Sequence, residues 1–433
     1  MTPGPRSMLR WIVRGERHVT TSLDALSDDL RALQRRVDDI AARRPPAAPE
    51  PFVPGPDPWL VAAEPSTSGV NVVGYLQHQI GLGDAGRRMC DVLAAGDVAT
   101  SPIAYGATSS PLLPVAYPTT QRVDHDTTIV VAAADQLPAL RRDHPELFDA
   151  SRRVVAHPFW EVSELSPAGS AGLELVDEVW APTSFVADVF ARAGDVAVRH
   201  VPLPFARPRP SGRARSSFAA LADAGERIVF GVTFDHFSVM ERKNPLGAIE
   251  AYRRAFPPGS DTLLVVKTLN AGHHPIADAQ LRAAAAHRSD VVVWDEHLDR
   301  ADQLAFIAQL DVLVSLHRGE GLGLHLAEAM WSGVPVVATG WSGNVDFMDD
   351  SCARLVDHTL VEVRGGGTIY PDGARWADPD LDAAAGAMSS LAGDDVLRGD
   401  LGRAARRRMQ DQPDDRSVAR GIAGLLEHDI ERP

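Results

Sequence analysis

Two carboxylates mark a glycine-rich turn in the second half of the chain. Glu320 lies inside the turn, and Glu328 follows eight residues later. The apolar residues 311–316 before the turn predict a buried parallel strand, and those after it predict a helix from about Leu322 to Gly333. Such a turn presents unpaired N–H groups and the positive end of a helix at the carboxyl edge of a sheet, where anions bind.

The spacing of the two carboxylates bears on the chemistry that they could do. Eight helical residues would hold them roughly 12 Å apart. A carboxylate pair that cleaves one glycosidic bond is about 5 Å apart, or up to about 9.5 Å with a water molecule between. The spacing therefore favours binding two parts of one long ligand. The alternative is a glutamate on a solvated helix face with a loop glutamate nearby, and the glycines argue against it.

A group of cations follows the apolar strand 227–233. Arg242 and Lys243 stand immediately before a helix that Pro245 begins. Two cations beside a helix N-terminus and a strand end form an anion clamp, whereas a surface charge pair is the plainer alternative. Lys267, at the end of the strand sequence LLVVK, is a further candidate cation.

The sequence EGLGLHLAEAM from Glu320 resembles the E-x7-E signature of family 4 of the retaining glycosyltransferases. The resemblance implies an α/β protein of the GT-B fold, with two Rossmann-like domains facing a cleft. It implies that Glu320 faces the hydroxyls of a donor sugar, that Glu328 faces the ribose, and that Lys243 binds the diphosphate. The backbone N–H groups that would also meet the diphosphate belong to Gly321, Leu322, Gly323 and Leu324.

The chain departs from this family pattern at two places. His325 stands where the family often has proline. The family's basic residue after strand 227–233 is replaced by the sequence Phe-Asp-His, so either Arg242 or Lys267 would supply the second diphosphate cation. The family is typically metal-independent, and no cofactor is expected.

Composition narrows the class of protein. The 433 residues are 45 % hydrophobic and 23 % charged, which is ordinary for a globular protein with two domains. The net charge of −15 argues against nucleic-acid binding. Cys90 and Cys352 are far apart, form no metal-ligand pattern and suggest a reducing compartment. No apolar run approaches the roughly 20 residues that span a bilayer, so a cytoplasmic protein is expected.

Three segments precede the predicted catalytic domains. Residues 1–19 are a basic head, for which contact with an anionic membrane surface and a short disordered head are the alternatives. Residues 20–44 carry a heptad pattern of leucines that predicts a coiled coil joining copies of the chain, although a helix docked on the protein's own surface is also open. Residues 45–69 are proline-rich and predict a linker.

Residues 70–205 predict the first, acceptor-binding domain. After a strand over 70–76, the sequence GLGDAG forms a G-x-G-x-x-G pattern, but the acidic residue expected about 20 positions later in a dinucleotide site is missing. The NAD interpretation is therefore rejected. The glycosyltransferase resemblance implies instead that Gly81 and Gly83 border the cleft.

Further strands are predicted over 127–134, 152–157, 177–181 and 196–203, which gives an open parallel sheet. Asp135 and His157 stand where two of these strands end, and ligands gather at such ends. Glu161 lies in the sequence HPFWEVSEL, which resembles the acceptor-side loop of sugar transferases; satisfying the local backbone is the alternative role. Residues 206–225 predict an interdomain linker, and residues 226–433 predict the nucleotide-sugar domain with terminal helices.

These features predict a retaining, metal-independent hexosyltransferase. It would move a sugar from a GDP-mannose or UDP-hexose type of donor to a glycan, a lipid-linked acceptor or a small molecule. A nucleotide-sugar epimerase and an inactive scaffold of a polysaccharide assembly complex are the alternatives. An epimerase should convert its donor with no acceptor present, and a scaffold should bind no nucleotide.

Overall fold

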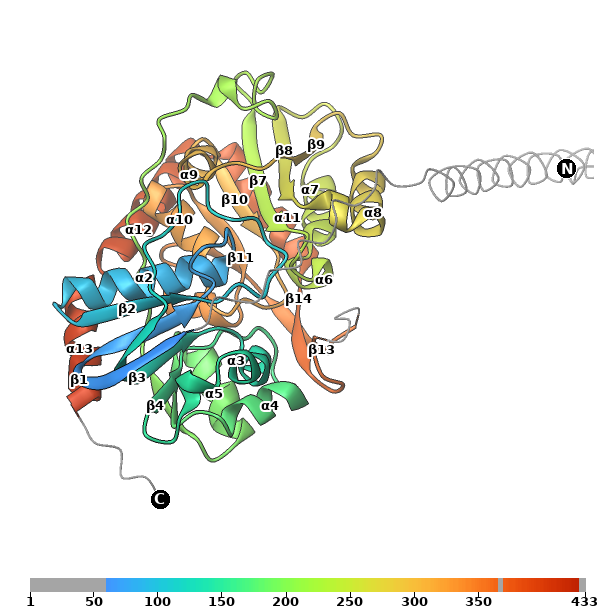
Figure 1. The fold of residues 1–433 in the computed structure, drawn as a ribbon. Helices are drawn as coiled ribbons and strands as arrows, with labels where there is room; N and C mark the ends of the chain where they lie inside the picture. Colours follow the sequence, from blue (N-terminus) through green and yellow to red (C-terminus); the bar gives the residue numbers. More distant parts are fainter. Residues whose placement is uncertain (1–59, 365–368, 428–433) are drawn as a thin grey trace, which may run out of the picture. The chain divides into compact units, whose positions relative to one another are not determined.

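The computed structural model describes residues 60–364 and 369–427. The predicted head, the coiled coil and residues 45–59 of the predicted linker lie outside the described residues. Two six-stranded parallel sheets, connected through helices, form the framework of the described chain (Figure 1). Among the described residues, no helix combines the length and the apolar character needed to cross a membrane.

The first sheet has the strand order β2-β1-β3-β4-β5-β6. Its strands are β1 (Val61–Gly74), β2 (Ala99–Ala104), β3 (Arg122–Val131), β4 (Arg153–Ala156), β5 (Glu178–Ala181) and β6 (Ala197–His200). The helices of this part are α2 (Gly81–Ala95), α3 (Leu137–Asp143), α4 (Pro167–Leu173) and α5 (Ser184–Ala193). Strand sequences such as TIVV in β3 are mostly apolar, because helices cover the strands of such a sheet on both faces.

Strand β1 differs from the expectation. It begins at Val61, whereas the sequence predicts the first strand from Val70 and assigns the residues before it to the linker 45–69. β1 pairs with β3 through two register shifts before Val70. Pro65 and its polar neighbours interrupt the apolar pattern in this part of the strand, so it lacks the signal of a buried strand.

The second sheet has the order β12-β11-β10-β7-β8-β9. Its strands are β7 (Ile228–Asp235), β8 (Thr262–Leu269), β9 (Val291–Asp295), β10 (Val312–Ser315), β11 (Val336–Thr339) and β12 (Arg354–Val356). The helices are α6 (Met240–Lys243), α7 (Pro245–Ala255), α8 (Pro275–Ala285), α9 (Arg300–Ala308), α10 (Leu324–Ser332), α11 (Leu381–Gly393) and α12 (Asp395–Gln410). Buried side chains pack on both faces of this sheet, and the central strands are therefore apolar on both sides.

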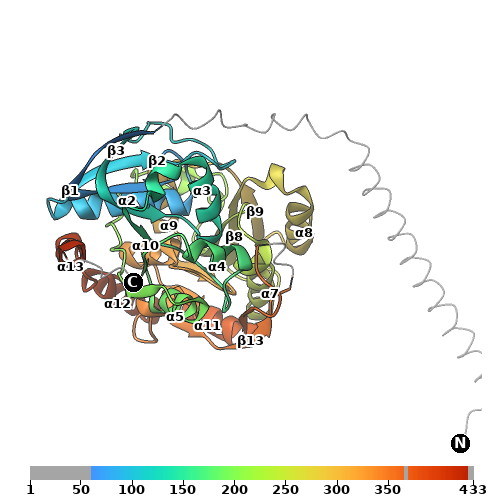
Figure 2. The same cartoon turned by 60° about the horizontal axis from the view of Figure 1, so that its bottom comes forward.

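Two elements of the second half of the chain pack on the first sheet's domain. The antiparallel pair β13 (His358–Glu362) and β14 (Arg375–Pro379) contributes Trp376 to the core around β3 and β4. The last helix, α13 (Asp415–Glu427), lies against α2, where Ile422 is buried (Figures 1 and 2). The sequence predicts the terminal helices but gives no sign that the last one crosses to the first sheet.

Candidate functional site

A cavity of about 500 Å³ is lined by residues of the second sheet and its loops, and by α2 and loops beside the first sheet. The first half of the chain contributes Gly81, Asp84 and Glu161, among others, and the second half contributes Lys243 and Glu320 together with the start of α10. These second-half residues follow the carboxyl ends of parallel strands, which is where ligands bind in open α/β sheets. The cavity therefore brings together residues that are separated by more than half of the chain.

The predicted glycine turn forms one wall of the cavity. Gly323 has φ 90° and precedes α10, which begins at Leu324, two residues later than expected. Only glycine adopts this left-handed conformation without strain, and it supplies no side chain to cap the helix. The first N–H groups of α10 are therefore not satisfied by a capping side chain, and they can meet an anion in the cavity.

Glu320 forms an ion pair with Lys243 inside the cavity. Nη1 of Arg242 lies 3.6 Å from the same carboxylate oxygen. Burial by itself would raise the pKa of Glu320, but the positive charges of Lys243 and Arg242 outweigh it and hold the pKa well below its usual range. Glu320 is therefore ionised, and it neutralises part of the positive charge that faces the cavity.

Backbone contacts fix Arg242 and Lys243 beside the glycine turn. The N–H of Arg318 donates to the carbonyl of Arg242 at 2.7 Å, and Nη1 of Arg242 donates to the carbonyl of Gly319 at 2.9 Å. Asn244 has left-handed φ of 51°, caps α7, and donates from Nδ2 to the carbonyl of Leu316 at 2.8 Å. The short sequence Arg-Lys-Asn-Pro thus connects two helices and the end of β10, which is why it can position a cation so closely.

Glu328 forms an ion pair with Arg300, the first residue of α9. Burial raises the pKa of Glu328, and the charge of Arg300 opposes this effect. Nε of Arg300 also lies 3.9 Å from Asp84 on α2. Glu320 and Glu328 therefore have different cationic partners, Lys243 and Arg300.

Lys267 lines the same cavity from β8. Its side chain is buried, and Nζ donates to the carbonyl of Glu296 at 2.5 Å and to that of Thr268 at 3.2 Å. Burial lowers the pKa of Lys267 to about 8, although Asp295 and Asp235 nearby oppose the change. β8 continues to Leu269, so Lys267 lies within the strand and not at its end.

The first-domain candidates separate into two groups. Gly81 and Glu161 line the cavity, whereas Gly83, Asp135 and His157 do not. Gly83 lies within α2 and not in a loop, and a Cβ atom there would come 2.6 Å from each of two backbone carbonyl oxygens, so its role in the structure is close packing. His157 is fully buried against Phe159, and burial lowers its pKa to about 4.

Asp135 lies in a short 3-10 helix after β3, and burial raises its pKa, with a smaller contribution from the negative charge of Glu161. Glu161 is held by the second half of the chain. The hydroxyl of Tyr370 donates to Oε2 of Glu161 at 3.2 Å, and Nη2 of Arg242 lies 3.8 Å from Oε1. The backbone of the same loop covers the glycine turn so closely that a Cβ atom at Gly319 would overlap the carbonyl oxygen of Glu161. Gly319 therefore serves packing between the two loops.

Sequence reasoning passed over several residues that line the cavity. Arg300 was not singled out, although an arginine that begins a helix facing Glu328 is placed unfavourably for the helix dipole. His325 was noted only as a departure from the family. Its Nε2 lies 3.3 Å from Oγ of Ser315. Asp235, the last residue of β7, and Phe237 in the following turn also line the cavity.

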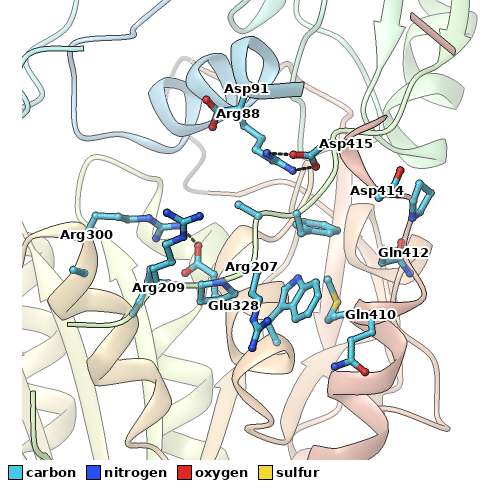
Figure 3. Close-up of a pocket in the computed structure, with 18 residues that line it drawn as sticks. Arg88, Asp91, Arg207, Arg209, Arg300, Glu328, Gln410, Gln412, Asp414 and Asp415 are labelled. Atoms are coloured by element: carbon cyan, nitrogen blue, oxygen red, sulfur yellow. Dashed lines mark hydrogen bonds and ion pairs between the residues drawn. The ribbon is translucent and has the colours of Figure 1, made fainter. Parts of the chain in front are cut away.

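A second cavity, of about 1180 Å³, adjoins the first at Arg300 and Glu328. Figure 3 shows the ion pair of these residues, with Arg209 beside it and the pair Arg88–Asp415 facing it. The walls of this second cavity come from α2, α9 and α10, from the segment 205–209 between the two sheets, and from the junction of α12 and α13. The chain passes from the first sheet to the second through residues 201–227, and it returns to the first sheet's domain at the junction of α12 and α13. Both of these segments border this cavity.

Residues 240–365 match the family model described as Glycosyl transferases group 1. The match includes the glycine turn, both glutamates and Lys243, and it covers the strands of the second sheet other than β7. No curated protein matches this chain.

Several solved structures share the fold. HepE of Anabaena, in complex with UDP and glucose, has a TM-score of 0.58 at 16 % identity, with 83 % of this chain and 99 % of HepE covered. The UDP-forming trehalose-phosphate synthase of Burkholderia xenovorans has a TM-score of 0.56 at 12 % identity, with coverage of 83 % and 99 %.

TarM of S. aureus, in complex with fondaparinux, α-GlcNAc-glycerol and UDP, has a TM-score of 0.52 at 11 % identity; 71 % of this chain matches, and it spans 56 % of the TarM chain. At these identities the structural matches establish the fold, which is GT-B as the sequence predicts. The family match over residues 240–365 is what supports a glycosyltransferase.

Proposed function

We propose that this protein is a retaining glycosyltransferase that uses a nucleotide-sugar donor. The observation that carries the proposal is the joint presence of Lys243, Glu320 and the uncapped start of α10 in one cavity, opposite residues of the first sheet. A GT-B protein that had lost its activity would be free to lose this arrangement.

The donor would lie along the second sheet. Its diphosphate would meet the N–H groups at Gly321 to Leu324 and the ammonium group of Lys243, which stabilise the charge that develops on the leaving group. Lys243 would exchange Glu320 for the diphosphate in this complex. Glu320 would then be released to accept hydrogen bonds from the donor sugar, while Glu328 would exchange Arg300 for the ribose.

The acceptor would lie on the first sheet's side, near Gly81 and Glu161. Retention of configuration would follow from attack on the same face that the diphosphate leaves, with the departing phosphate oxygen taking the acceptor's proton. No enzyme carboxylate then needs to be glycosylated, which agrees with the pairing of Glu320 with cations. Arg242 would act as a positioning residue, because it bridges Gly319 and Glu161, and Lys267 would be the second cation near the donor.

Binding of nucleotides tests the proposal most directly. Thermal unfolding and calorimetry would be carried out with UDP, GDP, their sugar derivatives and inorganic pyrophosphate. A ligand at a hundredfold excess over its Kd stabilises the folded state by about 2.7 kcal/mol. Lys243→Ala should lower the affinity for nucleotides and for pyrophosphate alike, by roughly tenfold to a hundredfold, because it removes a charge-assisted hydrogen bond to phosphate.

Two further variants sharpen the result. Glu328→Ala should lower the affinity for nucleoside diphosphates. It should leave the affinity for pyrophosphate unchanged, because pyrophosphate has no ribose. Arg282→Ala removes one positive charge from the exposed pair Arg282–Asp278 on α8 and is the matched control. If no nucleotide binds the wild-type protein, the transferase proposal is wrong, and the result favours an inactive scaffold. If a nucleotide-sugar is converted with no acceptor present, the epimerase alternative gains.

A further inference from the structure

His325 occupies a place in the donor cavity where its proton can respond to a ligand. It is the second residue of α10, and it lines the cavity together with Glu320 and Lys243. Its Nε2 lies 3.3 Å from Oγ of Ser315, whereas its Nδ1 makes no hydrogen bond to the described residues. One ring nitrogen is therefore anchored, and the other is available.

A buried chain of hydrogen bonds behind His325 decides which nitrogen carries the hydrogen. Nδ2 of Asn344 donates to the carbonyl of Thr339 at 3.0 Å, so its Oδ1 must accept from Nε2 of His317 at 3.1 Å. Burial lowers the pKa of His317, which favours a neutral ring. With Nε2 donating, Nδ1 of this neutral ring carries no hydrogen, and it lies 3.1 Å from both the hydroxyl and the carbonyl oxygen of Ser315. The hydroxyl of Ser315, at 3.1 Å, then donates to that nitrogen.

This order leaves one arrangement for His325. The only hydrogen of the Ser315 hydroxyl is directed to His317, so Oγ can only accept from His325. Nε2 of His325 therefore donates, and Nδ1 keeps a bare lone pair. A lone pair next to the oxygens of a diphosphate is repelled, whereas a proton on Nδ1 would convert the repulsion into a charge-assisted hydrogen bond.

We propose that His325 takes up a proton on Nδ1 when a nucleotide-sugar diphosphate binds, so that imidazolium and ligand anion pair at the start of α10. The inference rests on the proposed function, because it concerns the same donor site. The balance is simple: the free ligand, one proton from solvent and the neutral imidazole give the bound anion beside an imidazolium, and no covalent bond changes. The family pattern, with proline at this position, could not make this pair.

The charges around His325 explain why the proton would arrive only with the ligand. Lys243 and Arg242 of α6 and the ring of His317 disfavour a charge on His325, while Glu320 favours it. Burial is the largest cause and lowers the pKa of His325 to about 3. Each negative charge brought to about 5 Å at an effective dielectric constant of about 20 raises the proton affinity on the order of a hundredfold. The two charges of a nucleotide-sugar diphosphate can therefore bring the titration of His325 toward neutral pH.

The sign of the pH dependence follows directly. A group whose pKa is raised by the ligand binds a proton with it, so affinity is highest at low pH and is lost as pH rises through the pKa in the complex. The affinity should fall by up to about tenfold for each pH unit in that range. Lys267 would add proton uptake near pH 8, so the measurement belongs at about pH 6 to 7.

Calorimetry can count the protons. The binding enthalpies of UDP-glucose and GDP-mannose would be measured at about pH 6 in buffers that differ in ionisation enthalpy. These ligands are diphosphate diesters and lack the terminal phosphate that titrates near pH 6. The wild-type protein should take up close to one proton per ligand bound. His325→Gln can keep the contact to Ser315 but cannot titrate, so it should take up almost none and bind with little pH dependence.

A histidine outside the site provides the control. His287 is exposed after α8 with φ 64°, a conformation that asparagine tolerates, so His287→Asn should match the wild type. Equal proton uptake in wild type and His325→Gln, or none in the wild type despite binding, would overturn the inference and leave the proposed function intact. Failure of both ligands to bind the wild type would overturn both.

Discussion

Lys243 and Glu320 illustrate how a single ion pair can prepare a binding site. The side chain of Lys243 is 15 % exposed and that of Glu320 is 8 % exposed, so both charges are largely removed from water. Such a pair is costly to break by deleting one partner, because the other charge stays buried and unpaired. If a diphosphate replaces Glu320 as the partner of Lys243, the lysine stays paired, and Arg242, 3.6 Å away, stays beside the Glu320 carboxylate. The pair therefore keeps a cation in the cavity until an anion arrives.

Lys243→Ala should lower stability in a manner that depends on pH. The pKa of Glu320 is lowered in the folded protein by Lys243 and Arg242 despite burial, whereas an unfolded glutamate titrates near 4.3. The stabilising contribution is therefore present above about pH 4.5 and is lost as pH falls. At pH 7 the variant should lose about 1–3 kcal/mol, and the difference from wild type should shrink toward about pH 3.

Thermal unfolding across this pH range measures the effect. Arg254→Ala is the control, because Arg254 pairs with Glu250 and Asp382 on the exposed surface and its removal should change Tm only slightly. A Tm difference between wild type and Lys243→Ala that stays constant from pH 7 to pH 3 would show that the pair with Glu320 does not set the stability.

At the scale of elements, the glycine turn and the loop after β4 form one unit. The carbonyl of Glu161 covers Gly319, and Oγ1 of Thr183, just before α5, donates to the carbonyl of Gly321 at 3.1 Å. The turn proposed to bind the donor is thus packed against the loop proposed to face the acceptor. Any displacement of one loop is transmitted to the other, which would couple the two halves of the site.

Gly319→Ala tests this coupling. The added methyl group would overlap the carbonyl of Glu161, and backbone on both sides cannot yield without moving the loops. We expect a loss of about 1–3 kcal/mol in stability together with weaker nucleotide binding. Gly386→Ala is the matched control: Gly386 lies in α11 with open space around its Cβ position, so alanine should stabilise the helix by up to about 1 kcal/mol. Calorimetry measures nucleotide affinity and thermal unfolding measures Tm for both variants. If Gly319→Ala and Gly386→Ala have the same affinity and the same Tm, the two loops are not coupled.

The elements of the second sheet were largely predictable, because the strands β7 to β10 are apolar runs that each lead through a turn into a helix. The glycine turn also carries its own signal, since Gly323 and Gly333 both occupy left-handed positions at the two ends of α10. The partners of Glu320 and Glu328 had weaker signals. Arg300 is 28 residues from Glu328, and only the packing of α9 beside α10 brings them together.

Residues across the two sheets were harder to predict. Gly83 matched a loop pattern, but the chain continues as helix through it, and contact with two carbonyls explains the glycine. The link from Tyr370 to Glu161 spans 209 residues, and no local pattern announces it. Sequence periodicity reports burial, not the identity of the neighbour. The parts of the site that one segment forms were therefore predictable, and those that two segments share were not.

For the whole molecule, α13 is the element that completes the first sheet's domain from the other end of the chain. Arg88 of α2 forms an ion pair with Asp415, and Nη1 of Arg153 on β4 donates to the carbonyl of Leu425 at 3.0 Å. The chain thus crosses between the sheets twice, at 201–227 and at the junction of α12 and α13. Two crossings restrict the relative movement of the sheets to directions that both segments permit.

Ile422→Asp tests the role of α13. Ile422 is 1 % exposed and belongs to the core that α2 and β1 share. A buried, unpaired carboxylate should cost about 2–5 kcal/mol, because apolar contact is lost and a charge is desolvated.

Gly421→Ala on the same helix has open space around its Cβ position and should be neutral or stabilising. No residue of α13 lines the 500 Å³ cavity, although Ile422 belongs to the same buried core as Leu322. Nucleotide affinity measured well below Tm should therefore be largely retained in Ile422→Asp, whereas sugar transfer, which needs both sheets, should fall. Equal loss of nucleotide binding and of sugar transfer would mean instead that the two sheets unfold as one unit, and that the second sheet does not stay folded without α13.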